Sequence, residues 1–280
     1  MAKRRALLIG VNSYRIPGAD LRGCVNDVEN VRDMLLRWFD FPRSGIRTVT
    51  DGRATQDRIK ESMAKIIGSA RPGDVVLIHY SGHGSNIPDA DGDEADERDE
   101  ILCPHDLDWK SDDQLSDDWL RTTLDQVPDG VNLTVTFDCC HSGTGTRPLP
   151  RPGEPMARFL PHPLDLLAGE SGRALRGEVH SVRRQRSRGT LAGDVHDVDI
   201  PEVLLTGSRD DQTSADAFID GDYHGAMSYS MWTAVDRAKG RLTYRQLHER
   251  MLEYLEGSYS QVPQLEGRAA LLDMPVLRPL

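Results

Sequence analysis

The sequence has few cysteines and no long hydrophobic segment. Only 4 of its 280 residues are cysteine, and no two are spaced as C-x-x-C, so neither a disulfide framework nor a zinc site is indicated. No stretch approaches the roughly 20 apolar residues that a membrane-spanning helix needs. The N-terminal apolar run, residues 6–11, is too short for the core of a signal peptide. We therefore expect a cytoplasmic protein, in a reducing compartment and with no membrane partner.

Positive charge is also scarce. The chain has 34 Lys and Arg against 45 Asp and Glu, and its formal net charge is −11. Nucleic acids and anionic membranes recruit proteins through basic surfaces, so neither is expected as the main partner. The acidic excess permits a negatively charged pocket for a cationic group.

Short apolar runs alternate with amphipathic helical patterns along most of the chain. Alternation of this kind predicts an α/β fold with a mostly parallel sheet and helices on both faces. In such sheets the functional site lies beyond the carboxyl ends of the strands. The predicted strands are residues 6–11, 46–50, 74–80, 131–137 and a strand within 198–205; the predicted helices begin at Asn26 and after Thr55, and cover 225–238 and 243–255.

Residues 144–197 depart from this pattern. They contain six prolines between 148 and 163, followed by a basic stretch over 173–188. This composition predicts a long loop that is partly disordered.

Two of the predicted strands end in residues that suit nucleophilic catalysis. His83, between two glycines, follows one strand, and the pair Cys139 and Cys140 follows another. A thiolate nucleophile needs a base within hydrogen-bonding distance, and His83 can supply one. Consecutive strand residues face opposite sides, so only one of the two cysteines faces His83, and periodicity does not decide which. The structural alternative is a buried cysteine and an unrelated histidine.

The segments that carry these residues resemble the caspase superfamily, and within it the metacaspases and their bacterial relatives, the orthocaspases. The resemblance implies a caspase-like three-layer sandwich with a mostly parallel central sheet flanked by helices. In this single domain, 1–143 is a large catalytic part, 144–197 a processing linker and 198–280 a small part. The matching segments are residues 5–12, 21–27, 80–85, 138–143, 210–216 and 264–267.

The family pattern D-x-C-H-S-G places the nucleophile on Cys140 and leaves Cys139 at its variable position. The same resemblance implies that His83 is the general base. It also implies an oxyanion hole formed by the backbone N–H groups of Gly84 and Cys140.

The acidic residues near the nucleophile predict which side chain the substrate presents to the enzyme. Asp138 stands two positions before the nucleophile, and the resemblance places Cys24, Asp27 and Ser81 beside it. Two carboxylates in a cleft favour a guanidinium or ammonium group, Arg especially because it pairs in a bidentate manner. The sequence therefore predicts a pocket for Arg, or Lys, in proteins or peptides. The alternative is that Asp27 only caps the first helix.

The basic stretch of the linker suits the same preference, because a flexible arginine-rich segment is a substrate for a basic-specific protease. A solvated linker or a strip that docks a partner is the alternative. The candidate self-cleavage residues are Arg173, Arg176, Arg183, Arg184, Arg186 and Arg188.

The acidic run over 89–100 is not an EF-hand, since Glu94 stands where the loop needs glycine. The resemblance suggests calcium as an activator, held by Asp99, Asp117 and Asp118. The family's further Asp is replaced here by Arg147, which removes one ligand and adds a cation. The alternative is a solvated acidic loop, and the chemistry itself requires no cofactor.

These inferences together predict a cysteine endopeptidase that acts after Arg or Lys, monomeric as the metacaspase type tends to be. The alternative from another class is a catalytically silent scaffold that binds partners through its acidic and arginine-rich loops. The intact Cys140 and His83 argue against that alternative.

Overall fold

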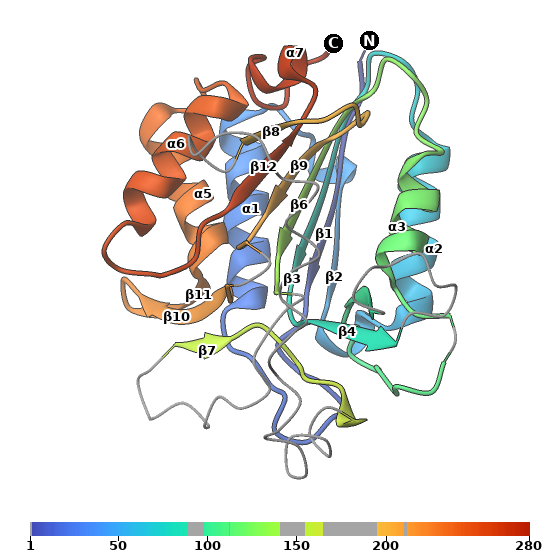
Figure 1. Ribbon diagram of the computed structural model, residues 1–280. Coiled ribbons are helices and arrows are strands. Elements are labelled where there is room, and N and C mark those ends of the chain that lie inside the picture. Colours follow the sequence, from blue (N-terminus) through green and yellow to red (C-terminus); the bar gives the residue numbers. More distant parts are fainter. Residues whose placement is uncertain (1, 89–97, 112, 141–154, 165–194, 210–211) are drawn as a thin grey trace.

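The computed structural model describes residues 2–88, 98–111, 113–140, 155–164, 195–209 and 212–280. Within these residues, a seven-stranded sheet forms the centre of the molecule (Figure 1). The strands are parallel except at the β9–β12 pair, which is antiparallel. Their spatial order is β2 (Ile46–Thr50), β1 (Arg4–Gly10), β3 (Val75–Ser81), β6 (Asn132–Asp138), β9 (Val203–Thr206), β12 (Gln264–Gly267) and β8 (Val195–Asp197).

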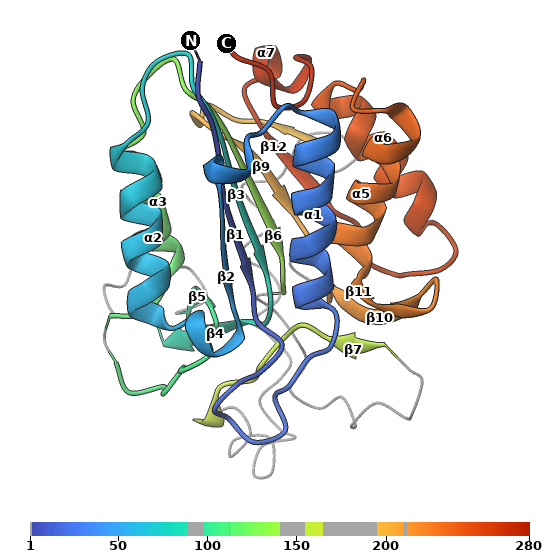
Figure 2. The ribbon, with the colours of Figure 1, turned by 180° about the vertical axis from the view of Figure 1, so that it is seen from behind.

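Helices cover both faces of this sheet, which gives three layers (Figures 1 and 2). One face is covered by α1 (Cys24–Trp38), α5 (Ala226–Ala238) and α6 (Tyr244–Leu255), and the other by α2 (Gln56–Gly68) and α3 (Asp117–Leu124). The short helix α7 (Ala269–Leu272) lies near the C-terminus. None of the helices in the described part of the chain is long and apolar enough to cross a membrane.

Alternation along the strands divides the core between the two faces. In β1, Leu7 and Ile9 join the cluster that includes Met63 of α2, whereas Leu8 joins the cluster that includes Val28 of α1. This period of two is what a strand buried on both faces requires. It explains why the buried part of the strand, after the two arginines at its start, has no polar side chain.

Two small sheets lie at the carboxyl ends of the central strands, opposite the chain termini (Figure 1). One is the antiparallel pair β4 (Gly84–Pro88) and β5 (Arg98–Leu102). The other has the order β11 (Asp222–Gly225), β10 (Ala215–Ile219) and β7 (Met156–Ala157). Both sheets border the region where the sequence predicts a site.

The predicted α/β architecture, its central strands and its four main helices are confirmed. Thr55 caps α2 as expected, because its side chain accepts a hydrogen bond from the N–H of Arg58. Asp27 does not cap the first helix: α1 begins at Cys24, and no side chain caps it. The predicted loop over 144–197 needs correction at two places, since β7 and β8 lie within it.

Candidate active site

The central sheet brings His83 and Cys140 to the same edge. Strands β3 and β6 are parallel neighbours, and their last residues, Ser81 and Asp138, are register partners. His83 follows β3 by two residues, and Cys140 follows β6 by two residues. The carboxyl ends of the two strands therefore bring the two residues to the same edge of the sheet, as expected for parallel neighbours.

The backbone and ring of His83 are held by hydrogen bonds. Its N–H donates to Tyr14 Oη at 2.8 Å, and its carbonyl accepts from Tyr80 Oη at 2.6 Å. Imidazole Nε2 lies 2.8 Å from the carbonyl oxygen of Ala19. A carbonyl can only accept, so Nε2 carries the proton in the neutral ring. The preceding Gly82 allows this packing, because a Cβ there would lie 2.5 Å from Tyr80 Oη.

The other imidazole nitrogen of His83 is available as a base. Nδ1 is buried and has no hydrogen-bond partner among the described residues. Burial lowers the pKa of His83 to about 4, because the charged imidazolium is poorly solvated there. The ring is therefore neutral at pH 7, with its lone pair on Nδ1.

The thiol of Cys140 is also buried and neutral. The residue is 1% exposed, and Sγ accepts a hydrogen bond from the N–H of Ser214 and lies 3.6 Å from the Ser214 carbonyl oxygen. Burial raises the pKa of Cys140 to about 12. Cys139 instead packs in the hydrophobic core between the sheet and α2 and α3.

Two backbone N–H groups beside this pair converge on one oxygen. Gly84 N and Cys140 N donate to the carbonyl oxygen of Arg158 at 3.0 and 3.2 Å. A pair of donors aimed at one carbonyl is the arrangement that stabilises an oxyanion during acyl transfer. These are the two groups that the resemblance suggested.

A buried acidic pocket holds the side chain of Arg158. The guanidinium is fully buried and lies among Asp27, Asp138 and Asp216. Nη2 is 2.8 Å from Asp27 Oδ2 and 2.9 Å from Asp216 Oδ1, and Nη1 is 3.1 Å from Asp138 Oδ2. Nη1 also donates to Ser81 Oγ at 2.7 Å. Three carboxylates around one planar cation make a pocket that suits arginine.

Backbone amides hold the three carboxylates in place. Asp216 accepts from the N–H groups of Arg22 and Gly23, both at 3.0 Å, and Asp27 accepts from Gly225 N at 3.0 Å. Asp138 Oδ2 accepts from Ser228 N at 2.8 Å, in the first turn of α5. A helix N-terminus stabilises a carboxylate at this position.

Gly225 leaves room for the guanidinium. A Cβ at this residue would lie 2.1 Å from Asp138 Oδ2 and 2.2 Å from Arg158 Nη1. Both distances are far below any ordinary contact, so a side chain here would close the pocket.

The charges in the pocket influence one another. Burial acts to lower the pKa of Arg158, but Asp138, the Cys24 thiol and the carboxylates of Asp27 and Asp216 outweigh it, and the pKa rises well above its usual value. Burial acts to raise the pKa of Asp27, but Arg158 and hydrogen bonds from His224 and Ser81 leave it below its ordinary value. For Asp138, burial outweighs Arg158 and the pKa is raised. The bound cation therefore helps to keep the pocket ionised.

Three of the four pocket residues predicted from sequence, Asp27, Ser81 and Asp138, contact Arg158 directly. The fourth, Cys24, is buried beside them, and Arg158 acts on its thiol electrostatically. The third carboxylate, Asp216, is a pocket residue that the sequence does not predict, although it ends one of the family-like segments. Nothing local in the sequence marks Arg158.

The suggested calcium ligands do not form a metal site in the part of the chain that the structure describes. Asp99 lies in β5, and Asp117 and Asp118 form the first turn of α3. Burial, Glu100 and Asp118 raise the pKa of Asp117. Among the described residues no three potential metal-binding side chains cluster, so these carboxylates alone do not make a calcium cage. Arg147 and the candidate self-cleavage arginines of the linker lie outside the described residues.

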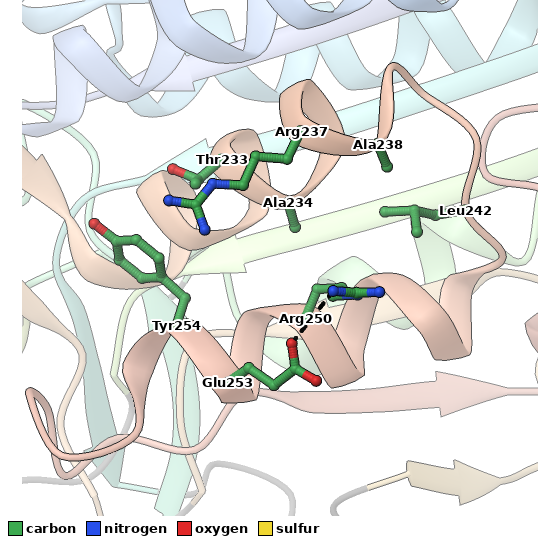
Figure 3. A pocket seen from close by; sticks show the side chains of 8 residues that line it. All are labelled: Thr233, Ala234, Arg237, Ala238, Leu242, Arg250, Glu253 and Tyr254. Atoms are coloured by element: carbon green, nitrogen blue, oxygen red, sulfur yellow. Dashed lines mark ion pairs between the residues drawn. The ribbon is translucent and has the colours of Figure 1, made fainter.

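A separate surface pocket of about 390 Å³ lies between α5 and α6 (Figure 3). Figure 3 shows that its sides are formed by both helices, with an ion pair between Arg250 and Glu253. It contains no cysteine or histidine and is not the candidate active site. Its lining residues are Thr233, Ala234, Arg237, Ala238, Leu242, Arg250, Glu253 and Tyr254.

Comparison with solved structures identifies the fold as that of the caspases. The crystal structure of caspase-1 from Spodoptera frugiperda superimposes with a TM-score of 0.55 at 11% identity, covering 95% of this chain and 90% of that one. A crystal structure of a Geobacter sulfurreducens protein superimposes with a TM-score of 0.67 at 23% identity, covering 99% of both chains. The likeness at these identities concerns the fold.

Sequence comparison then gives the family. The model of the metacaspase peptidase C14 domain matches residues 4–147. Metacaspase-1 of Pyricularia oryzae is 36% identical, covering 94% of this chain and 71% of the relative. Metacaspase-1A of Aspergillus oryzae is 34% identical, covering 98% of this chain and 70% of the relative. The chain therefore belongs to the metacaspase family and is a cysteine peptidase.

Proposed function

We propose that this metacaspase is an endopeptidase that cleaves after arginine, and more slowly after lysine, with Cys140 as nucleophile and His83 as general base. The observation that carries the proposal is the guanidinium held by three carboxylates while the carbonyl of the same residue accepts two N–H groups. One residue thus spans the specificity pocket and the position where an oxyanion would develop. A substrate arginine placed in the same way would present its carbonyl to Cys140.

The pocket favours arginine over lysine for a geometric reason. Both terminal nitrogens of Arg158 are used, Nη2 by Asp27 and Asp216, Nη1 by Asp138 and Ser81. A lysine ammonium is a single point charge and would satisfy fewer of these acceptors, leaving buried oxygens unpaired. An acidic side chain would add a fourth negative charge and be rejected.

In the proposed reaction, the substrate carbonyl accepts from Gly84 N and Cys140 N. The Cys140 thiol gives its proton to Nδ1 of His83 and attacks the carbonyl carbon, and His83 then protonates the leaving amine. Water hydrolyses the thioester. Ala19 supports this proton transfer, because its carbonyl fixes the protonated Nε2 and leaves Nδ1 as the acceptor.

Matched fluorogenic peptides that differ only in Arg, Lys or Asp before the scissile bond test the proposal. Arg is expected to give the highest kcat/KM, Lys a lower one, and Asp none. Cleavage after Asp alone would contradict the pocket assignment, and cleavage of no peptide by the folded protein would favour a silent scaffold.

The proposed substrates are proteins and peptides, and the proposed enzyme acts as a monomer in the cytoplasm. The four cysteines, all among the described residues, are thiols, which suits a reducing compartment.

Self-cleavage in the linker and stimulation by calcium are further parts of the proposal. The arginines between 173 and 188 give the linker suitable sites.

Calcium titrated into the peptide assay tests the proposed stimulation. The weakest protein calcium sites bind in roughly the millimolar range, so no change in activity up to that concentration would remove calcium from the proposal.

A further inference from the structure

Residues 156–160 cross the candidate active site as an extended segment. On one side of Arg158, Met156 and Ala157 pair antiparallel with Asp216 and Ala215 of β10, and Arg158 N donates to Ser214 O at 3.0 Å. Adding an extended strand to the edge of a small sheet is a common way of binding a peptide. The pairing therefore fixes the register of the segment on the N-terminal side of Arg158.

The segment is also held on the other side of Arg158. Phe159 bridges to Gly84 in the parallel sense, and Leu160 N donates to Gly84 O at 2.9 Å. Ser85 Oγ donates to the Leu160 carbonyl at 2.5 Å. Hydrogen bonds on both sides leave the Arg158–Phe159 peptide bond across the site, with its carbonyl oxygen on Gly84 N and Cys140 N.

We infer that residues 156–160 are an internal substrate: Arg158 fills the specificity pocket, the Arg158–Phe159 bond is a self-cleavage site, and the uncut segment excludes other substrates. The inference rests on the proposed function and adds a bond outside the arginine-rich stretch of the linker. Three independent contacts support it, namely the guanidinium pocket, the two N–H groups on the carbonyl, and strand pairing with β10.

The chemistry is that proposed for any substrate, carried out within one chain. Cys140 Sγ bonds to the carbonyl carbon of Arg158 as its proton passes to His83. His83 returns that proton to the Phe159 nitrogen as the Arg158–Phe159 bond breaks, which leaves a thioester. Water then hydrolyses the thioester, giving the Arg158 carboxylate and restoring the thiol.

Competition follows from the covalent connection. A segment tethered within the same chain has an effective concentration of about millimolar at its site. An added peptide must compete with it until the bond is cut. Peptide hydrolysis by the uncut protein should therefore show a lag that ends as the cut accumulates.

The test uses the full chain, with intact mass and N-terminal sequencing alongside hydrolysis of an Arg-containing fluorogenic peptide. We expect fragments 1–158 and 159–280 from the parent protein and none from Cys140→Ala. Because the reaction is intramolecular, its rate constant should not change over a roughly tenfold range of protein concentration. The control Arg176→Gln, in the basic stretch, should still give the fragment that begins at Phe159.

Two substitutions separate occupation of the pocket from cutting. Arg158→Gln should give no such fragment and hydrolyse the peptide without a lag. Phe159→Pro keeps the guanidinium of Arg158 in the pocket and places a proline ring at the scissile bond. The backbone N–H that it removes donates to no acceptor among the described residues. It should remain uncut at this bond and hydrolyse the peptide about tenfold more slowly or worse. Thermal unfolding shows whether each variant is folded. If Arg158→Gln does not fold, the result for Phe159→Pro alone decides the test.

The outcomes distinguish the two levels of the proposal. Hydrolysis of the peptide without a lag, no fragment beginning at Phe159, and a Phe159→Pro variant as active as the parent would overturn the internal substrate and leave the proposed function standing. Cuts only within 173–188 would also overturn it. No peptide hydrolysis by any folded variant would overturn the proposed function and the inference with it.

Discussion

The two halves of the candidate site are in different states. In the pocket, three carboxylates, a serine and the guanidinium of Arg158 are joined by short hydrogen bonds, and backbone amides brace the carboxylates. In the thiol–imidazole half, Cys140 Sγ is directed to Ser214, and His83 Nδ1 has no partner among the described residues. The pocket is occupied by a guanidinium paired with carboxylates, whereas both reacting groups are neutral.

This difference shows that recognition and reactivity have separate physical requirements here. Buried charges stay ionised only when paired, and the pocket supplies the pairing. Burial keeps both reacting groups neutral, since it raises the pKa of the thiol and lowers that of the imidazole. In the proposed mechanism the thiol must leave Ser214 and meet Nδ1, whereas the carboxylates of the pocket already surround a guanidinium.

The largest expected effect comes from removing the thiol. Cys140→Ala should lower kcat/KM for an Arg peptide by at least about 10⁴-fold, because the proposed acyl intermediate forms on the sulfur of Cys140. The matched control is the adjacent cysteine: Cys139→Ala should retain activity within about tenfold, since Cys139 lies in the core. Comparable losses of kcat/KM in the two variants would contradict the assignment of Cys140, and not Cys139, as the nucleophile.

The next largest effect is expected from the pocket. Asp138→Asn should reduce kcat/KM for Arg peptides about 10²- to 10³-fold, because truncating one partner of a buried ion pair costs about 2–5 kcal/mol. Asp236→Asn, a loss of the same charge at an exposed pair with Arg37, is the control and should change little. Equal activity of Asp138→Asn and the parent on Arg peptides would show that the carboxylate does not select the substrate.

Much of this arrangement was predictable from local sequence. The buried strand that ends at Ser81 and the one that ends at Asp138 are continuous apolar runs, and their parallel pairing brings His83 and Cys140 together. The helices that begin after Thr55 and Thr243 have caps that the sequence displays, the second as a capping box with Gln246. Such signals lie within a few residues of what they determine.

The missed features depend on contacts between distant residues. Strand β7 has only two residues in a proline-rich stretch, and it exists because Met156 and Ala157 pair with β10, about 60 positions away. Arg158 is one of many arginines in the sequence, and its pocket combines Asp27, Asp138 and Asp216 from three regions of the chain. No periodicity or spacing reports contacts of this kind.

A smaller effect is expected at Gly225. Gly225→Ala should lower kcat/KM for Arg peptides about 100-fold, because its Cβ would lie 2.1 Å from Asp138 Oδ2, where overpacking costs about 1–3 kcal/mol or somewhat more. The backbone at Gly225, with φ −72° and ψ 129°, suits alanine, so the loss would come from the pocket alone. The matched control, Gly68→Ala, meets nothing within 4 Å and should be silent. Unchanged catalysis in Gly225→Ala would mean that the pocket widens to accept a methyl group.

The smallest effect concerns protons on the buried histidines, which burial keeps neutral. His83 and His79 both have a pKa lowered to about 4, by burial first in each case. Such a histidine has a lower pKa in the folded protein than its value of about 6.5 in the unfolded chain. Its contribution to the free energy of unfolding is complete above about pH 6.5. That contribution is lost as the pH falls towards the folded pKa, because the unfolded chain then binds more protons than the folded one. Cys140→Ala, in which the segment remains uncut, is the suitable background.

Denaturant unfolding of Cys140→Ala at pH 7 and pH 5 should show a loss of free energy of unfolding of about 2 kcal/mol for each of the two histidines. Adding His79→Asn should remove about half of this loss, and adding His83→Asn should remove the other half. His79 is the matched control, since it is equally buried but hydrogen-bonded to Thr136, away from the reacting atoms. If His83→Asn enlarged the difference between the two pH values instead, the pKa of the imidazole would be raised on folding and the ring would be charged in the folded protein. The thiol–imidazole half would then already hold a charge, like the pocket, and the contrast between the two halves would disappear.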